Sequence, residues 1–150
     1  MRIIEALIGE HGALGAMLDH LQQAVPIVGG MWELRAQVSL LRSVLISQMT
    51  IEEELLFSSL EHAIGRDGPL AALRMERDKI EDALSWAPQV ESLDEAKRLV
   101  VETVNLARQN FQREEQVLFR LAEEKLHPDL LEKLGREWAE RRGVPVFANA

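Results

Sequence analysis

The sequence predicts an all-α protein, and three observations lead to this prediction. Apolar residues recur at steps of three and four, which is the periodicity of amphipathic helices. No convincing run of strictly alternating apolar and polar residues is present, so no strand is expected. Proline and glycine, the usual helix breakers, punctuate the long periodic segments. Together these observations predict an up-down-up-down four-helix bundle with a short fifth helix at the C-terminal end.

The helix breakers divide the chain into five expected helices. The breaks fall at Pro26 with Gly29 and Gly30, at residues 65–69, at Pro88 and at Pro128. The expected helices span residues 2–24, 32–64, 69–86, 92–126 and 129–141. Because the connections are short, successive helices are expected to be antiparallel neighbours.

Local signals support several of these helix ends. Ser92 with Glu95 three residues later is typical of a capping box at the start of the fourth helix. Pro69 and Pro128 suit the first turn of a helix, where the missing N–H costs nothing. Gly143 follows two arginines, a combination that favours a helix C-terminus.

Length, charge and composition limit the function classes. The chain has 150 residues and a net charge of −8, from 17 lysines and arginines against 25 aspartates and glutamates. We expect one domain over residues 1–150. The absence of cysteine excludes disulfides and thiolate metal sites, and the acidic balance argues against a nucleic-acid partner. No segment has the length of a membrane span, and acidic residues within the first apolar pattern argue against a signal peptide, so a cytoplasmic location without a membrane partner is expected.

An internal repeat relates the second and fourth expected helices. Glu-Glu-Glu-Leu-Leu-Phe at residues 52–57 matches Glu-Glu-Gln-Val-Leu-Phe at residues 114–119. Residues 10–14 and 76–80 match more weakly in the first and third helices. We interpret each helix pair as one copy of a helical hairpin, with equivalent positions facing each other across the core.

Polar residues interrupt the apolar stripes of all four long helices at matching depth. The six interrupting residues are His11, Gln48, Glu52, Arg77, Asn110 and Glu114. Helical spacing keeps each of them on the core-facing side. Because a buried charge without a partner costs several kcal/mol, we expect these residues to form a polar layer in which they satisfy one another or hold a ligand. In such a layer the amides of Gln48 and Asn110 would donate to the carboxylates, and Arg77 would pair with both glutamates.

Three further expectations concern the surroundings of this layer. The apolar stripe of the fourth helix is expected to comprise Leu99, Leu106, Val117 and Leu121. Glu53 and Glu115 are expected to turn away from the stripes into solvent. The tryptophans near helix ends are expected to pack at the ends of the bundle or under the fifth helix; they are Trp32, Trp86 and Trp138.

The helix order, the repeat and both Glu-Glu-x-x-Leu-Phe motifs resemble the hemerythrin-like, HHE cation-binding domain family. In that family, a Glu-His pair in helices one and three and a His-x-x-x-Glu motif in helices two and four hold a non-haem di-iron centre. The resemblance implies a vestigial metal set at the positions that keep the family's ligand types, which are His11, Glu52 and Glu114. Three other positions replace the family's histidines: Gln48, Arg77 and Asn110.

These replacements lead to three function hypotheses. Amides are weak ligands for first-row metals and a guanidinium keeps its proton, so we expect no metal cofactor. The leading hypothesis is a non-catalytic binding or sensing module for an unknown ligand or protein partner, with a buried polar network in place of the di-iron site. The alternative is a reduced site holding non-haem iron, zinc or manganese for a redox or oxygen- or metal-sensing role, through His11, Glu52 and Glu114. A third hypothesis is an ancillary domain or homodimer that uses only its outer faces.

Overall fold

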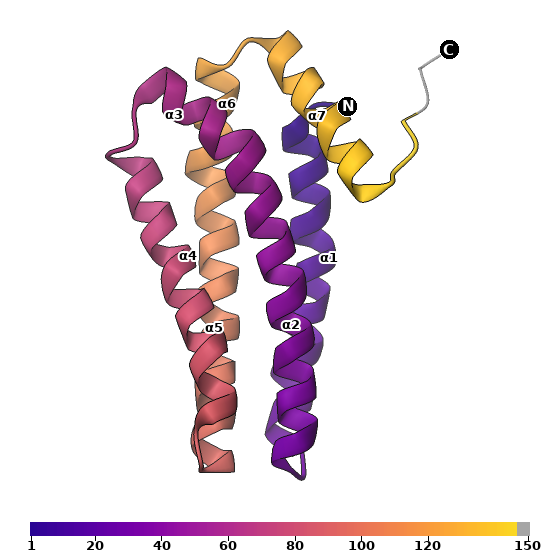
Figure 1. Ribbon diagram of the computed structural model, residues 1–150, viewed down its shortest axis with the longest axis vertical. Coiled ribbons are helices and arrows are strands. Elements are labelled where there is room, and N and C mark those ends of the chain that lie inside the picture. The colour runs from indigo at the N-terminus through magenta and orange to yellow at the C-terminus, as the bar shows by residue number, and fades with distance from the viewer. Residues whose placement is uncertain (147–150) are drawn as a thin grey trace.

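A computed structural model describes residues 1–146 as a bundle of long helices (Figure 1). The helices are α1 (Ile3–Ala24), α2 (Met31–Glu52), α3 (Ser58–Ile64), α4 (Pro69–Trp86), α5 (Leu93–Arg113), α6 (Phe119–Lys125) and α7 (Pro128–Arg142). Among the described residues there is no strand, which confirms the all-α prediction. None of the helices in this part of the chain is long and apolar enough to cross a membrane.

Two π-helical segments make longer rods from pairs of α-helices. Segment η2 (Glu53–Phe57) joins α2 to α3, and segment η4 (Glu114–Leu118) joins α5 to α6. In chain order the four rods of the bundle are α1, α2 with α3, α4, and α5 with α6. In each segment a backbone N–H donates to the carbonyl five residues earlier. Both segments lie inside the repeated motif, so the expected long helices are correct in extent but each contains one wider turn. Such turns occur frequently at functional sites.

The helix ends follow the local signals in the sequence. The Ser92 hydroxyl accepts a hydrogen bond from the backbone N–H of Glu95 at 3.3 Å, which confirms the N-cap half of the expected capping box. Pro69 and Pro128 are the first residues of α4 and α7. Gly143 closes α7 with a φ of 64°, a left-handed conformation that glycine adopts without a steric cost. Two 3₁₀ turns, Val25–Ile27 and Ala87–Gln89, lead out of α1 and α4.

A layer of buried polar residues divides the apolar core into two clusters. One cluster lies toward the end of the bundle that carries α7 and includes Leu7 and Phe57. The other lies toward the opposite end and includes Leu41 and Val104. The six polar residues of the expected layer lie at the boundary between these two clusters. The two clusters therefore shield the layer from solvent along the length of the bundle.

Helix α7 packs across the first turns of α1 and closes one end of the bundle (Figure 1). Its buried residues include Leu131, Leu134 and Trp138. Gly135 lies against the backbone of the N-terminal segment, where an added Cβ would be only 2.2 Å from the carbonyl oxygen of Met1. This close approach requires glycine, because any side chain would force the two segments apart.

The apolar stripe of the fourth rod differs from the expected one. Leu99, Val117 and Leu121 are only partly buried, and Leu106 is 41% exposed. The buried face instead consists of Ala96, Val100, Val104, Ala107, Phe111, Leu118 and Phe119. Small residues dominate this face within α5. Alanine is often buried, but it adds little to the apolar periodicity of a sequence, so the sequence pattern does not reveal this face. The π turn then brings two sequence neighbours, Leu118 and Phe119, into the core together.

Two of the three tryptophans do not pack as expected. Trp32 is 83% exposed and Trp86 is 59% exposed, whereas Trp138 is buried in the cluster beneath α7. Trp32 lies in the first turn of α2 and Trp86 is the last residue of α4. The guanidinium of Arg35 lies 5.9 Å from the Trp32 ring centroid. The prediction of packing at the helix ends is therefore wrong for Trp32 and Trp86 and correct for Trp138.

Candidate functional site

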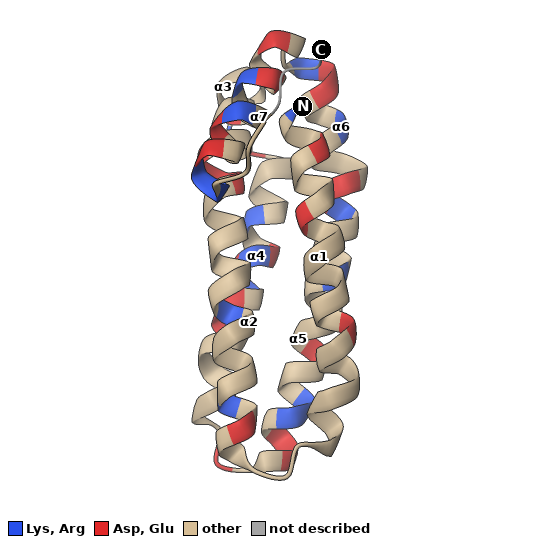
Figure 2. Ribbon diagram, turned by 90° about the vertical axis from the view of Figure 1, so that its right-hand side faces the viewer, with Lys and Arg blue, Asp and Glu red and all other residues tan. Residues whose placement is uncertain are grey.

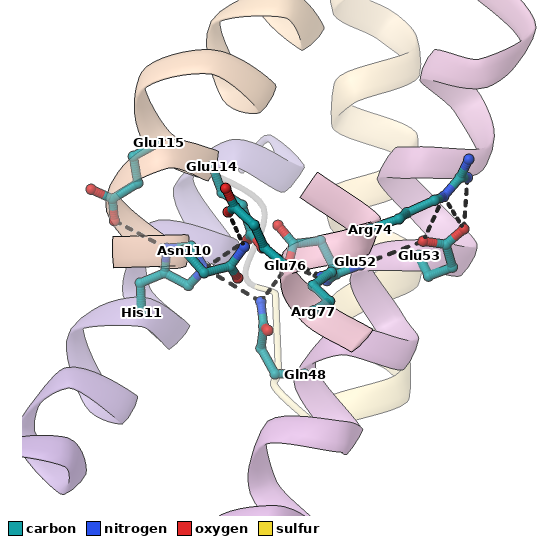
Figure 3. Close-up of polar contacts among 10 residues, drawn as sticks. All are labelled: His11, Gln48, Glu52, Glu53, Arg74, Glu76, Arg77, Asn110, Glu114 and Glu115. Atoms are coloured by element: carbon teal, nitrogen blue, oxygen red, sulfur yellow. Dashed lines mark hydrogen bonds and ion pairs between the residues drawn. The ribbon is translucent and has the colours of Figure 1, made fainter. Parts of the chain in front are cut away.

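The six polar residues expected in the core gather at one level of the bundle (Figure 3). They come from all four rods, and none of them is more than 5% exposed. In chain order they are His11 of α1, Gln48 and Glu52 of α2, Arg77 of α4, Asn110 of α5 and Glu114 at the start of η4. We call this set the polar layer.

The Arg77 guanidinium bridges the two buried carboxylates of the layer. Its Nη2 donates to Glu52 Oε2 at 2.7 Å, and its Nε lies 3.4 Å from Glu114 Oε1. The guanidinium carbon also lies 4.4 Å from the centroid of the Phe57 ring, which is within the range of a cation–π contact. Arg77 therefore pairs with both glutamates, as the sequence predicts.

Gln48 and His11 form the side of the layer at α1, the helix that carries His11. The Gln48 amide nitrogen donates to Glu52 Oε2 at 2.7 Å and lies 3.4 Å from His11 Nε2. His11 Nε2 also lies 3.4 Å from Glu114 Oε2. The imidazole is stacked on the Phe111 ring, with 4.2 Å between ring centroids. These contacts hold the His11 ring between an amide, a carboxyl group and an aromatic face.

Two glutamates expected in solvent are partly exposed and also contact the layer (Figure 3). Glu115 Oε1 lies 3.1 Å from His11 Nδ1. Glu53 accepts hydrogen bonds from Arg74 Nη2 at 2.7 Å and from Arg77 Nη1 at 3.4 Å. Both glutamate side chains are still 43% exposed, so they link the layer to the surface. Each lies in a π segment, whose wider turn an α-helical projection of the sequence does not include.

Asn110 lies at the edge of the layer and has a different partner from the expected one. Its Nδ2 donates to Glu76 Oε2 at 3.2 Å rather than to either layer carboxylate. Glu76 also pairs with Arg113 on the outside of α5. Of the two predicted amide donors, Gln48 therefore contacts a layer glutamate and Asn110 contacts a glutamate outside the layer.

Burial raises the pKa of both layer carboxyl groups. The pKa of Glu52 is raised well above its ordinary value of 4.5, first by burial and then by the charge of Glu114, while Arg77 opposes the rise. Burial also raises the pKa of Glu114, again against the influence of Arg77. Two close carboxyl groups titrate as a pair. One proton shared between them, together with the charge of Arg77, makes the three side chains neutral.

The layer contains a group of candidate metal ligands, but Arg77 lies among them. His11, Glu52 and Glu114 offer ligand atoms that all lie within 4.8 Å of one another. The guanidinium that donates to Glu52 and faces Glu114 brings a fixed positive charge to these same carboxylates. Three of the six layer side chains are two amides and one guanidinium, which first-row metals do not favour as ligands. The donor set, as arranged, does not fit a two-metal centre.

The fold and the layer define a class of protein: a helical bundle in which all four rods contribute to one buried polar site. A family model, the hemerythrin HHE cation binding domain, matches residues 2–87, more than half of the chain. The matched segment contains α1 to α4 and four of the six layer residues. The chain belongs to the hemerythrin HHE cation-binding domain family. No curated protein and no solved structure gave a match.

Proposed function

We propose that the protein is a non-catalytic, hemerythrin-like binding or sensing module in which the polar layer takes the place of a metal centre. The observation that supports this function is the position of Arg77, whose guanidinium contacts both Glu52 and Glu114. A metal cation would neutralise the same two carboxylates. Arg77 supplies this positive charge from the chain itself, and its forked donors suit carboxylate geometry.

The connections of the layer to the surface support a sensing or binding role. Glu115 reaches His11 from one side, and Glu53 reaches Arg77 from another, while both glutamates remain partly exposed. A ligand or partner that contacts either glutamate would alter the charge facing a buried residue. We propose that the layer responds to binding through these two side chains.

Metal analysis of the purified protein tests this function. The protein should be produced without chelator and examined by elemental analysis for iron, zinc and manganese. We expect a colourless protein with far less than one metal per chain, and an Arg77→His variant with more metal than the parent. One or more equivalents per chain in the parent, lost in Glu52→Gln, would contradict the proposal.

A reduced metal site is the second candidate function, and the grouping of three ligand atoms favours it. His11, Glu52 and Glu114 could hold a single divalent cation if Arg77 rotated toward Glu53, which already accepts one of its N–H groups. In that case, loss of His11 would release the metal. Elemental analysis of a His11→Ala variant beside the parent separates this candidate from the metal-free one.

A further inference from the structure

A pocket of about 360 Å³ lies between α1 and α2, beside the polar layer. Its polar wall consists of Glu10, Ser43, Ser47, Gln48 and Arg142. Gln48 therefore belongs both to this wall and to the layer. The pocket is separate from the three ligand atoms discussed above, because His11, Glu52 and Glu114 do not line it.

Arg142 spans the pocket from the last turn of α7. Its Nε donates to Glu10 Oε1, and its Nη1 donates to the Ser47 hydroxyl at 2.7 Å. The indole N–H of Trp138 also donates to Glu10 Oε1, at 2.8 Å. One oxygen of Glu10 thus receives two donors. The Arg142 side chain is 25% exposed, whereas Ser43 and Ser47 of the same wall are more exposed.

Two hydrogen-bond acceptors on residues of the pocket wall are unpaired. Glu10 Oε2 and Gln48 Oε1 are buried and have no hydrogen-bond partner within residues 1–146. Gln48 is 1% exposed, and its amide nitrogen is committed to Glu52 and His11, which fixes the orientation of its carbonyl. Because buried acceptors are normally paired, the two orphan acceptors indicate missing N–H or O–H donors. Both atoms lack accessible surface, so a ligand that brings such donors would have to displace a group of the wall such as Arg142.

The negative net charge of the chain favours a cationic donor over a neutral one. Within the pocket, Glu10 and Arg142 cancel each other. The adjoining layer adds no net charge when its two carboxyl groups share one proton beside Arg77, so the excess is the net charge of −8 on the whole chain. The remaining wall is apolar and consists of Ala13, Leu14 and Val44. A compact cation with several N–H donors and a short aliphatic part matches this combination.

We propose that the pocket binds small primary amines, with the ammonium group at Glu10 and the aliphatic part against the apolar wall. Arg142 then acts as an internal competitor, because its guanidinium already occupies the cation position at Glu10. The inference rests on the proposed function only in treating the domain as a binding module. Amine binding and metal content are measured separately, so either idea can fail without the other.

An NMR titration with n-butylammonium chloride tests the proposal. The Trp138 indole N–H signal is the reporter, since this group donates to Glu10. We expect a saturable shift of that signal and none for the exposed indoles of Trp32 and Trp86. Tetramethylammonium chloride has the same charge but no N–H donor, so it should produce no saturable shift. Equal effects of the two salts would overturn the proposal, because they would show ionic strength or charge alone at work.

Two variants and a matched control sharpen the test. Arg142→Gln should bind n-butylammonium about tenfold more tightly, because it removes the competing guanidinium from Glu10. Glu10→Gln should lose the saturable shift while its amide oxygen still accepts from Trp138, so the reporter is preserved. Arg136→Gln, an exposed change on the same helix, should bind like the parent. Unchanged affinity in Arg142→Gln, with a folded chain by circular dichroism, would refute the role of Arg142 as competitor.

Discussion

At the scale of single residues, the polar layer depends on the balance between two carboxyl groups and one guanidinium. Glu52 is fully buried and Glu114 is 1% exposed, so water and dissolved ions screen the charge of either carboxylate only weakly. Arg77 contacts both, and burial shifts both carboxyl groups toward their protonated forms. The layer therefore has two ways to avoid uncompensated charge, the guanidinium and a bound proton. Each way can be tested with one substitution.

Removal of the guanidinium should strongly destabilise the fold. Arg77→Ala leaves Glu52 and Glu114 facing each other without a cation and also removes the contact with Phe57. Breaking a buried pair in this way costs about 3–5 kcal/mol in the free energy of unfolding. Chemical denaturation of the variant and the parent at the same pH measures this loss.

A surface control and a compensated double variant test whether the loss of stability in Arg77→Ala comes from the buried charges. Arg136→Ala, at an exposed position of α7, should change stability by less than about 0.5 kcal/mol. Glu52→Gln combined with Arg77→Met should recover part of the loss, since it replaces one of the two facing carboxyl groups with a neutral amide when the guanidinium is removed. A neutral Arg77→Ala variant would mean that the guanidinium is not required to compensate the carboxylates.

The raised pKa of Glu52 predicts how stability depends on pH. The folded protein holds a proton on Glu52 at pH values where the unfolded chain, with a pKa near 4.5, has lost it. Between that value and the raised pKa the folded state binds more protons, so its stability falls as the pH rises. Glu52→Gln has no such proton, and its stability relative to the parent should increase with pH above about 4.5. Parallel stability curves for parent and variant from acidic to neutral pH would contradict the raised pKa.

The sequence predicts the members of the layer better than their contacts. Polar residues that interrupt an apolar stripe are visible without a structure, and all six are buried at one level. Arg77 was correctly expected to pair with both glutamates, because a guanidinium between buried carboxylates has few alternatives. The partner of Asn110 and the inward contacts of Glu53 and Glu115 were not predicted. These contacts depend on rotations of less than one helical turn, which the α-helical period does not determine near a π segment.

At the scale of elements, the helix boundaries follow from the sequence and the turns within the rods do not. Proline, glycine and serine signals locate the ends of α4, α5 and α7 because each acts through local backbone chemistry. The π segments leave one sign in the sequence, which is a run of three consecutive apolar residues in each copy of the repeat. One face of a regular α-helix cannot bury three consecutive residues equally. The packing of α7 on α1 is a long-range contact, and only the structure reveals the glycine on which it depends.

Gly135→Ala should destabilise the packing of α7 although alanine is the better helix former. The added Cβ would be 2.2 Å from the Met1 carbonyl oxygen, and the neighbouring atoms are backbone that cannot rotate away. We expect a loss of about 1–3 kcal/mol in the free energy of unfolding and faster amide exchange in α7. Gly12→Ala is the matched control, because nothing lies within 4 Å of its added Cβ in α1. That control should gain up to about 1 kcal/mol from helix propensity, and a similar gain in Gly135→Ala would show that α7 is not held at this distance.

At the scale of the whole molecule, the layer is assembled from both halves of the chain. The family match ends at residue 87, after His11, Gln48, Glu52 and Arg77. Glu114 comes from the second half, and the repeat places it opposite its counterpart Glu52 across the core. Charged residues of both signs are also concentrated around α7 and the neighbouring end of the bundle (Figure 2). The layer thus depends on correct docking of the two hairpins, and a test of its alignment must change residues in both.

Restoring the family's ligand set is such a test. The triple variant Gln48→His, Arg77→His and Asn110→His would place four imidazoles and two carboxylates at one level of the bundle, with the existing residues His11, Glu52 and Glu114. It also removes the positive charge that opposes cation entry. We expect this variant to bind iron, measured by anaerobic ferrous titration followed by metal analysis of the folded protein.

The single variants should separate the two reasons for the gain. Arg77→His adds a ligand and deletes the repelling charge, so it should bind more metal than either other single substitution. Asn110→His should contribute least alone, because the Asn110 side chain contacts Glu76 at the edge of the layer and Arg77 would still face Glu114. Circular dichroism of each variant separates weak binding from loss of the fold. If the triple variant folds and binds no more iron than the parent, the new imidazoles do not converge with the two glutamates. The alignment of the two hairpins with the family's ligand positions would then be wrong in register.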